Sequence, residues 1–226
     1  MTEEAMRQRY IIMAMGAMLF LFGFQATAQD DTLDEEQYLA SKQLLSNGWT
    51  MIDQEQFENA VDQFNQSITI FDGNTDAFVG RATALMRLGR LADAERDIEQ
   101  ALLLSPDQAD MYYLAGNIYF KMDNYEKATE NYSLAIKSNY SAEVPVDIVN
   151  LYYNRGNAYF SAGMYRSAIN DFSRVIEEKE DFVNAYHNRA LAYKNREDYE
   201  SACRDFETAV SLGSTLSQKF IDRYCK

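Results

Sequence analysis

Proline, histidine and cysteine are scarce in this sequence, which holds two prolines, one histidine and two cysteines among 226 residues. Because proline and glycine interrupt helices, two prolines and ten glycines leave long stretches that are compatible with helix. One histidine cannot supply a histidine-containing metal cluster, and the chain has no glycine-rich phosphate loop and no nucleophile motif. We therefore expect no catalysis, no cofactor and no metal site.

Positive charge is also in short supply, with 21 lysines and arginines against 35 aspartates and glutamates and a net charge of −14. An acidic surface repels phosphate backbones and anionic lipid headgroups, so we expect neither nucleic-acid nor membrane-surface binding. The simplest interpretation of the acidity is solubility. No residue pattern indicates a small-molecule substrate.

The N-terminal segment has the form of a secretory signal peptide. Two arginines precede an apolar run at 10–24, and a small-x-small pattern follows that ends at Ala28. An apolar core of about 15 residues is short for a membrane span, which needs about 20. We predict a signal peptide at 1–28 that is cleaved before Gln29. The protein is then periplasmic or secreted, and it meets the membrane only through this segment before cleavage. An uncleaved anchor is the alternative, and Met6 is an alternative start.

From residue 41 the sequence repeats itself with a period of 34 residues. Every unit has a small residue at position 8 and alanine at position 20, and large apolar or aromatic residues fill positions 4, 17 and 24. The alanines at position 20 are Ala60, Ala94, Ala128, Ala168 and Ala202. An insertion at 143–148 contains Pro145 and is expected to form an exposed loop. The five units are 41–74, 75–108, 109–142, 149–182 and 183–216.

These columns resemble the tetratricopeptide repeat family, whose pattern has a small residue at 8, aromatics at 11, 17 and 24, and alanine at 20. The resemblance covers 41–216 and implies an all-α fold, a right-handed α-solenoid of five antiparallel helix pairs with a concave groove. Before it, a capping-box pattern at Thr32 is expected to start a helix in the extension 29–40. After it, an amphipathic segment with the C-terminal capping helix 217–226 is expected to bury Leu216, Phe220, Ile221 and Tyr224.

Wherever position 7 of a unit is arginine, position 23 of the same unit is aspartate. Counted from the turn between the helices, these positions lie opposite each other on antiparallel helices, so we predict a charge-assisted pair inside each such unit. Independent surface charges are the alternative. The predicted structural ion pairs are Arg81 with Asp97, Arg155 with Asp171, and Arg189 with Asp205.

The resemblance also suggests how the two cysteines are used. Cys203 opens the second helix of the last unit, on the side where a further repeat would pack, and Cys225 ends the capping helix, which should run antiparallel to it. The C-terminal sequence resembles the terminal repeats of exported bacterial members of the family. We predict a Cys203–Cys225 disulfide, with two unpaired thiols as the alternative. A catalytic pair of Cys203 and His187 is excluded, because positions 21 and 5 of a unit point to different faces.

The resemblance places positions 5, 9 and 12 of each first helix on the concave face, with position 6 beside them. In units three to five these positions are rich in asparagine, which can satisfy both groups of a peptide backbone, and in aromatic rings. The family's carboxylate clamp keeps its two asparagines here but lacks its three cations, which puts capture of an acidic C-terminus in doubt. Asn157 and Tyr153 are expected to point into the groove rather than between helices. The predicted partner-binding residues are Tyr113, Asn117, Phe120, Tyr153, Asn154, Asn157, Phe160, His187 and Asn188.

Two interpretations of this groove are kept open. Its aromatics could serve ordinary packing between helices, and His187 could be a rim residue with no special role. At the level of function, the pattern favours a non-catalytic scaffold of the bacterial envelope that binds a protein or peptide segment in the groove. The alternative is a structural subunit that uses its ends or convex face to assemble an envelope complex. The two differ in whether the groove is open or is filled by its own chain or a second copy.

Overall fold

The computed structural model describes residues 35–142 and 145–225. The predicted signal peptide, its cleavage point before Gln29 and the capping box at Thr32 lie outside the described residues. Within them, no helix is both long enough and apolar enough to span a membrane.

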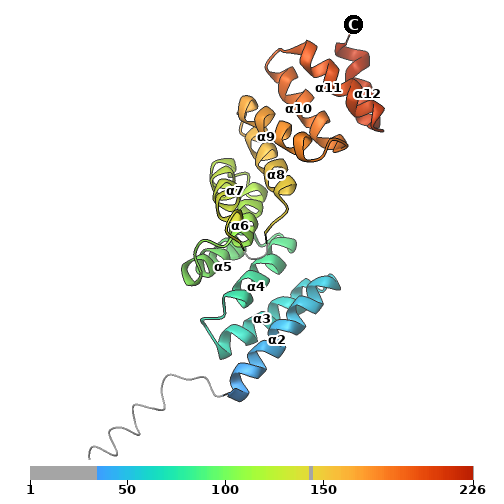
Figure 1. The fold of residues 1–226 in the computed structure, drawn as a ribbon. Helices are drawn as coiled ribbons and strands as arrows, with labels where there is room; N and C mark the ends of the chain where they lie inside the picture. Colours follow the sequence, from blue (N-terminus) through green and yellow to red (C-terminus); the bar gives the residue numbers. More distant parts are fainter. Residues whose placement is uncertain (1–34, 143–144, 226) are drawn as a thin grey trace, which may run out of the picture.

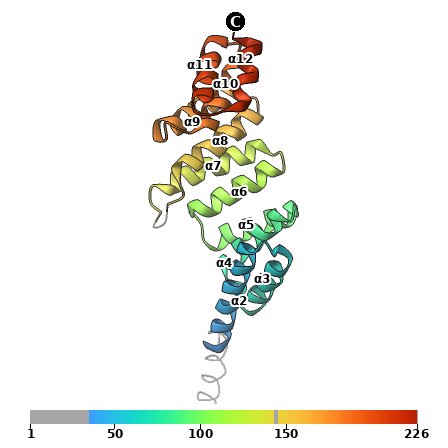
Figure 2. The same cartoon turned by 90° about the vertical axis from the view of Figure 1, so that its right-hand side faces the viewer.

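The described chain is helical throughout, as the repeat pattern predicts, and forms eleven helices and no strand. Figures 1 and 2 show these helices stacked into an elongated array with α2 at one end and α12 at the other. Each unit contributes a first and a second helix that pack against each other. The pairs are α2 (Glu35–Asp53) with α3 (Phe57–Ile70), α4 (Thr75–Arg87) with α5 (Leu91–Leu104), α6 (Ala109–Lys121) with α7 (Tyr125–Asn139), α8 (Ile148–Ser161) with α9 (Tyr165–Glu178), and α10 (Val183–Asn195) with α11 (Tyr199–Ser211), followed by α12 (Thr215–Tyr224).

The first helices of successive units contact one another along the stack, from α2 with α4 through α8 with α10. The second helices of successive units make no comparable contact within the described residues. The array therefore curves toward its first helices, which form an inner layer, while the second helices form an outer layer. This arrangement brings the side chains of α6, α8 and α10 onto one surface.

Close contact within each pair depends on the small residue at position 8. A β-carbon added to Gly156 would lie 2.8 Å from the Phe172 ring, and one added to Gly116 would lie 2.6 Å from the Tyr132 ring. The rings at position 24 are fully buried or nearly so. A larger residue at position 8 would displace such a ring. The small residue on one helix and the ring facing it on the other therefore determine how closely the two helices of a unit pack.

The insertion after α7 is tied to the end of that helix. Asn139 donates its amide to the Val146 carbonyl at 2.9 Å and accepts the Val146 N–H at 2.7 Å. Val146 and Ile148 then pack against Ile136 and Leu151. The longer connection thus leads into α8 without opening the contact between α7 and α8.

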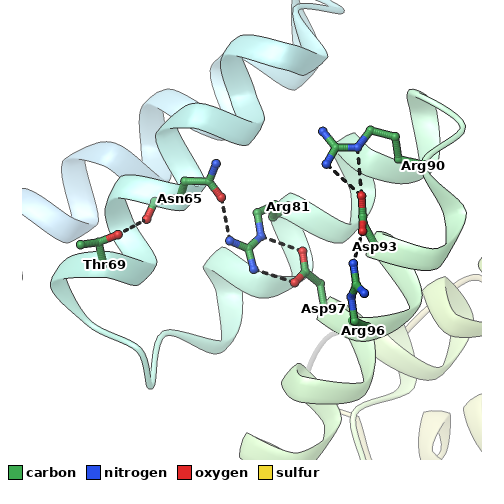
Figure 3. A network of polar contacts seen from close by, with 7 residues as sticks. All are labelled: Asn65, Thr69, Arg81, Arg90, Asp93, Arg96 and Asp97. Atoms are coloured by element: carbon green, nitrogen blue, oxygen red, sulfur yellow. Dashed lines mark hydrogen bonds and ion pairs between the residues drawn. The ribbon is translucent and has the colours of Figure 1, made fainter.

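Each predicted arginine is bonded to its aspartate, and it also reaches a third helix. Arg81 of α4 holds Asp97 of α5 through hydrogen bonds of 2.7 and 2.6 Å, and it donates to Asn65 of α3 at 2.7 Å (Figure 3). The same arrangement recurs in two later units, where the third partner is a serine of the preceding second helix: Arg155 with Asp171 and Ser133, and Arg189 with Asp205 and Ser173. Each arginine therefore links its own helix pair to the unit before it.

Helix α12 covers the end of the stack and is fastened to α11 by the Cys203–Cys225 disulfide. The Phe220 ring stacks on Phe206 with ring centres 5.0 Å apart. The prediction that Leu216 belongs to the buried face is wrong, because Leu216 is 62% exposed. Ser217 is buried in its place, since its hydroxyl bonds to Ser214 and reaches back toward α10.

Candidate functional site

Tyr113 and Asn117 lie one turn apart on α6 and contact Asn154 of α8, a group that we call the first tier. Asn154 donates its amide to the Tyr113 hydroxyl at 2.8 Å and to Asn117 Oδ1 at 3.4 Å. All three side chains are half-buried on the inner layer. The tier therefore joins two successive units through polar groups that also remain partly open to solvent.

Tyr132 of α7 fixes the orientation of one amide in this tier. Its hydroxyl donates to Asn117 Oδ1 at 2.8 Å. Burial raises the pKa of Tyr132 well above its ordinary value, so the hydroxyl keeps the hydrogen that it donates. Because Asn117 Oδ1 accepts from both Tyr132 and Asn154, the Asn117 amide N–H₂ is turned away and has no partner among the described residues.

The second tier repeats this geometry one unit further along. Asn188 of α10 donates to Asn157 Oδ1 at 2.9 Å and to the Tyr153 hydroxyl at 3.2 Å. Phe172 occupies the place of Tyr132, so here the asparagine of α10 alone orients Asn157. The sequence predicts asparagines that offer a donor and an acceptor to a partner, but in both tiers about half of these groups are used inside the protein.

The tyrosines of the tiers also support the fold. The Tyr153 ring lies 5.0 Å from the Phe182 ring and 6.0 Å from the Phe172 ring, and the Tyr113 ring lies 6.1 Å from that of Tyr132. The expectation that Tyr153 points only into the groove is therefore wrong. Its ring packs between helices, and its hydroxyl is the part that belongs to the tier.

Phe120 and Phe160 are not part of either tier. Phe120 packs on Tyr125 with ring centres 5.6 Å apart, and Phe160 packs on Tyr165 at 5.5 Å. Both contacts join the end of a first helix to the start of the second helix of the same unit. Ordinary packing, the alternative for these two rings, accounts for their position.

His187 occupies the position of Tyr113 and Tyr153 in the last unit, but α12 covers it. Its Nδ1 lies 2.8 Å from the Ser217 hydroxyl, and its ring makes edge contacts with Phe206 and Phe220 at 5.7 and 5.5 Å. The tiers therefore end at α10, where His187 contacts α12.

His187 is expected to make the cap sensitive to acid. Burial lowers the pKa of His187 below its ordinary value. The unfolded chain then takes up a proton at a higher pH than the folded chain. The contribution of His187 to the free energy of unfolding is therefore full above about pH 6.5 and is lost as the pH falls through the lowered pKa. Thermal unfolding at about pH 7.5 and 5.5 should show the loss, and His187→Gln should reduce it. An equal loss in the variant would assign the effect to other groups.

Other surfaces offer less for binding. An open cleft of about 330 Å³ lies between α3, α4 and α5 around the Arg81–Asp97 pair, and Arg90 and Arg96 at its edge both bond to Asp93 (Figure 3). Its arginines are thus already paired with carboxylates, and we assign it no ligand. Across the described residues, no group of three or more acidic, histidine or cysteine side chains is arranged to hold a metal ion.

Sequence comparison identifies the repeat. Models of the tetratricopeptide repeat match residues 79–142, 149–182 and 183–212. The Hsp70-Hsp90 organizing protein of Triticum aestivum is 26% identical over 108 residues, which are 46% of this chain and 19% of that protein. Hsp70-Hsp90 organizing protein 3 of Arabidopsis thaliana is 29% identical over 84 residues, 37% of this chain and 15% of that protein. The chain thus spans less than a fifth of the length of these curated relatives.

Solved structures share the arrangement of helices. A crystal structure of MamA superposes with a TM-score of 0.68 at 21% identity, covering 82% of this chain and 95% of that one. YrrB, described as a TPR protein with an unusual peptide-binding site, gives a TM-score of 0.71 at 15% identity and covers 88% and 97%. At such identities the likeness shows the fold alone. Together with the repeat models, which match more than half of the sequence, it shows that this chain belongs to the tetratricopeptide repeat family.

Proposed function

We propose that this protein is a non-catalytic interaction scaffold whose inner layer binds a segment of a protein partner. The observation that carries this proposal is the pair of tiers on α6, α8 and α10, in which polar side chains are held in place and still keep free hydrogen-bonding groups. When no partner is bound these groups bond to water, which the polar groups of a partner can replace. Side chains held in this way bind with little further loss of conformational entropy.

The kind of partner follows from what the tiers contain and what they lack. The carboxylate clamp of this family uses cations, but the corresponding positions here hold Tyr113, Asn184 and Asn188. The inner layer is thus suited to neutral polar groups, above all those of a peptide backbone, and we expect its affinity to depend little on salt. Two relatives are named as organizing proteins and one is described by its peptide-binding site, which agrees with this role for the fold.

We further propose that the protein acts in the bacterial envelope after export. The apolar run at 10–24 and the small residues before Gln29 support cleavage by a signal peptidase, and a disulfide suits an oxidising compartment. Protein isolated from the envelope fraction should have the intact mass of a chain that begins at Gln29. A chain that keeps the apolar segment and partitions with membranes would instead be anchored.

Asn157→Ala is expected to weaken partner binding by about 1–3 kcal/mol, because a desolvated partner group loses its hydrogen bond and Asn188 loses its acceptor. The partner is to be recovered by pull-down from envelope extract and titrated by calorimetry. Asn170→Ala on α9 is the matched control, since it removes an exposed amide on the outer layer. Equal affinities of the two variants, both folded by circular dichroism, would move the binding surface elsewhere.

A structural subunit is the second candidate, and exposed apolar residues favour it. Leu103 at the end of α5 is 78% exposed and Tyr140 after α7 is 80% exposed. Leu104, next to Leu103, is also exposed at 41%, and contiguous exposed apolar side chains are typical of surfaces that assemble, whereas single ones are ordinary. A Leu103→Ser variant that leaves the mass of an isolated envelope complex unchanged would argue against this role.

A further inference from the structure

Each tier leaves the hydrogen-bonding groups of one peptide unit unmatched. In the first tier, the Asn117 N–H₂ and the hydrogen of the Tyr113 hydroxyl have no acceptor among the described residues, and Asn154 Oδ1 has no donor. A peptide carbonyl has two lone pairs and a peptide N–H gives one hydrogen. A backbone C=O can accept one hydrogen from the amide and one from the hydroxyl, and a backbone N–H can donate to the free Oδ1, which leaves one amide hydrogen to solvent.

The second tier offers the same set in the same order. The Asn157 N–H₂ and the hydrogen of the Tyr153 hydroxyl are free of described partners, and so is Asn188 Oδ1. The tiers differ by one unit of the stack, and α6, α8 and α10 contact each other in sequence. Helices in contact are spaced by about 8–10 Å, so the two tiers repeat at roughly that distance.

This spacing discriminates between conformations of a bound chain. An α-helix uses its own N–H and C=O groups, so it has none to offer the tiers. In a β-strand, residues on one face repeat about every 6.6 Å, which does not fit. A polyproline II helix rises about 3.1 Å per residue with three residues per turn, so equivalent backbone groups on one side repeat about every 9.3 Å.

We propose that the two tiers bind the main chain of a partner segment in polyproline II conformation, at residues i and i+3, and that neither of these residues is proline. This inference rests on the proposed function and specifies the partner for the same surface. Proline is excluded at the two contact residues because it has no N–H for Asn154 or Asn188 to accept. The residues between them face away from the tiers and can vary.

The test uses a random twelve-residue peptide library displayed on phage and selected on the purified protein. A selected binder is then synthesised as a series with one N-methylated residue at a time and as a matching alanine series. N-methylation should weaken binding roughly tenfold or more at two residues that are three apart. Alanine at the same two residues should change affinity less than about threefold, because the side chains are not read.

Variants of the protein assign the two sensitive residues. Asn154→Ala removes the acceptor of the first tier, so sensitivity to N-methylation should disappear at one of the two residues and persist at the other. Asn170→Ala, on the outer layer, should leave binding sensitive to N-methylation at both residues. If N-methylation weakened binding at every residue, at no residue, or at two residues that are two or four apart, the polyproline II assignment would be wrong. The peptide would still bind in the groove in that case. A selection that enriches no peptide dependent on Asn157 would remove the proposed function and this inference with it.

Discussion

Arg155→Met is expected to lower the free energy of unfolding by about 3–5 kcal/mol. Arg155 holds Asp171 through two hydrogen bonds of 2.8 Å and Ser133 through one of 3.0 Å. The Asp171 side chain is only 6% exposed, so removal of the arginine leaves a buried charge without a partner. Methionine fills much of the same space, and the loss therefore reports the unpaired charge rather than a cavity. Chemical denaturation followed by circular dichroism measures it.

Two further variants make this prediction specific. Arg174 bonds to Glu177 on the surface, where both side chains are about 60% exposed, so Arg174→Met should cost less than about 1 kcal/mol. Replacing the whole buried pair, as in Arg155→Met with Asp171→Leu, should recover most of the loss, since no buried charge remains. A loss in Arg155→Met no larger than that in Arg174→Met would show that the pair contributes little.

The same variant should respond to pH in a defined direction. Burial raises the pKa of Asp171, and the hydrogen bonds and charge of Arg155 oppose that rise. Without Arg155 the folded chain binds this proton more tightly than the unfolded chain, whose aspartate pKa is about 3.9. The contribution of Asp171 protonation to the free energy of unfolding is then full below the pKa of the unfolded chain. It is lost as the pH rises through the pKa of the folded chain. The difference between wild type and Arg155→Met should therefore be smaller near pH 5 than near pH 8.

The arginine pairs show how far the sequence could predict the fold. Positions 7 and 23 pair because two antiparallel helices joined by a short turn place them opposite each other, and that geometry is local. The third partner, such as Ser133 for Arg155, depends on how successive units are offset in the stack, which no single unit encodes. A signal did exist, since position 25 is Asn65, Ser133 or Ser173 in the units that precede an arginine.

The candidate site was predicted less completely than the fold. The repeat pattern identified Asn117, Asn154, Asn157 and Asn188 because their positions recur. It could not show that the tyrosine hydroxyls bond to these amides across units, because such bonds depend on side-chain rotamers and on the spacing of the helices. Similarly, the phase of α12 was misjudged at Leu216, since the buried contact of Ser217 with His187 is a tertiary hydrogen bond and not a hydrophobic signal.

Reduction of the Cys203–Cys225 disulfide, or its removal in Cys203→Ser with Cys225→Ser, is expected to cost about 3 kcal/mol of stability in the last unit. The bond closes a loop with a sequence separation of 22 residues, and a loop of this size restricts the unfolded chain by about that amount. Helix α12 has ten residues, which is too short to be stable alone in water, so its order depends on this bond and on the contact of Phe220 with Phe206.

The loss should be confined to one end of the array. In a stack whose units contact only their neighbours, a change at α12 propagates weakly, so amide hydrogen exchange should accelerate in α12 and the end of α11 and stay unchanged in α2 and α3. Adding a reductant to the wild type should reproduce the exchange pattern of the double serine variant, and adding it to that variant should have no effect. If α12 keeps its protection and the protein its stability without the bond, the aromatic contacts and the His187–Ser217 hydrogen bond alone would hold the cap, and His187→Gln should then be the variant that releases it.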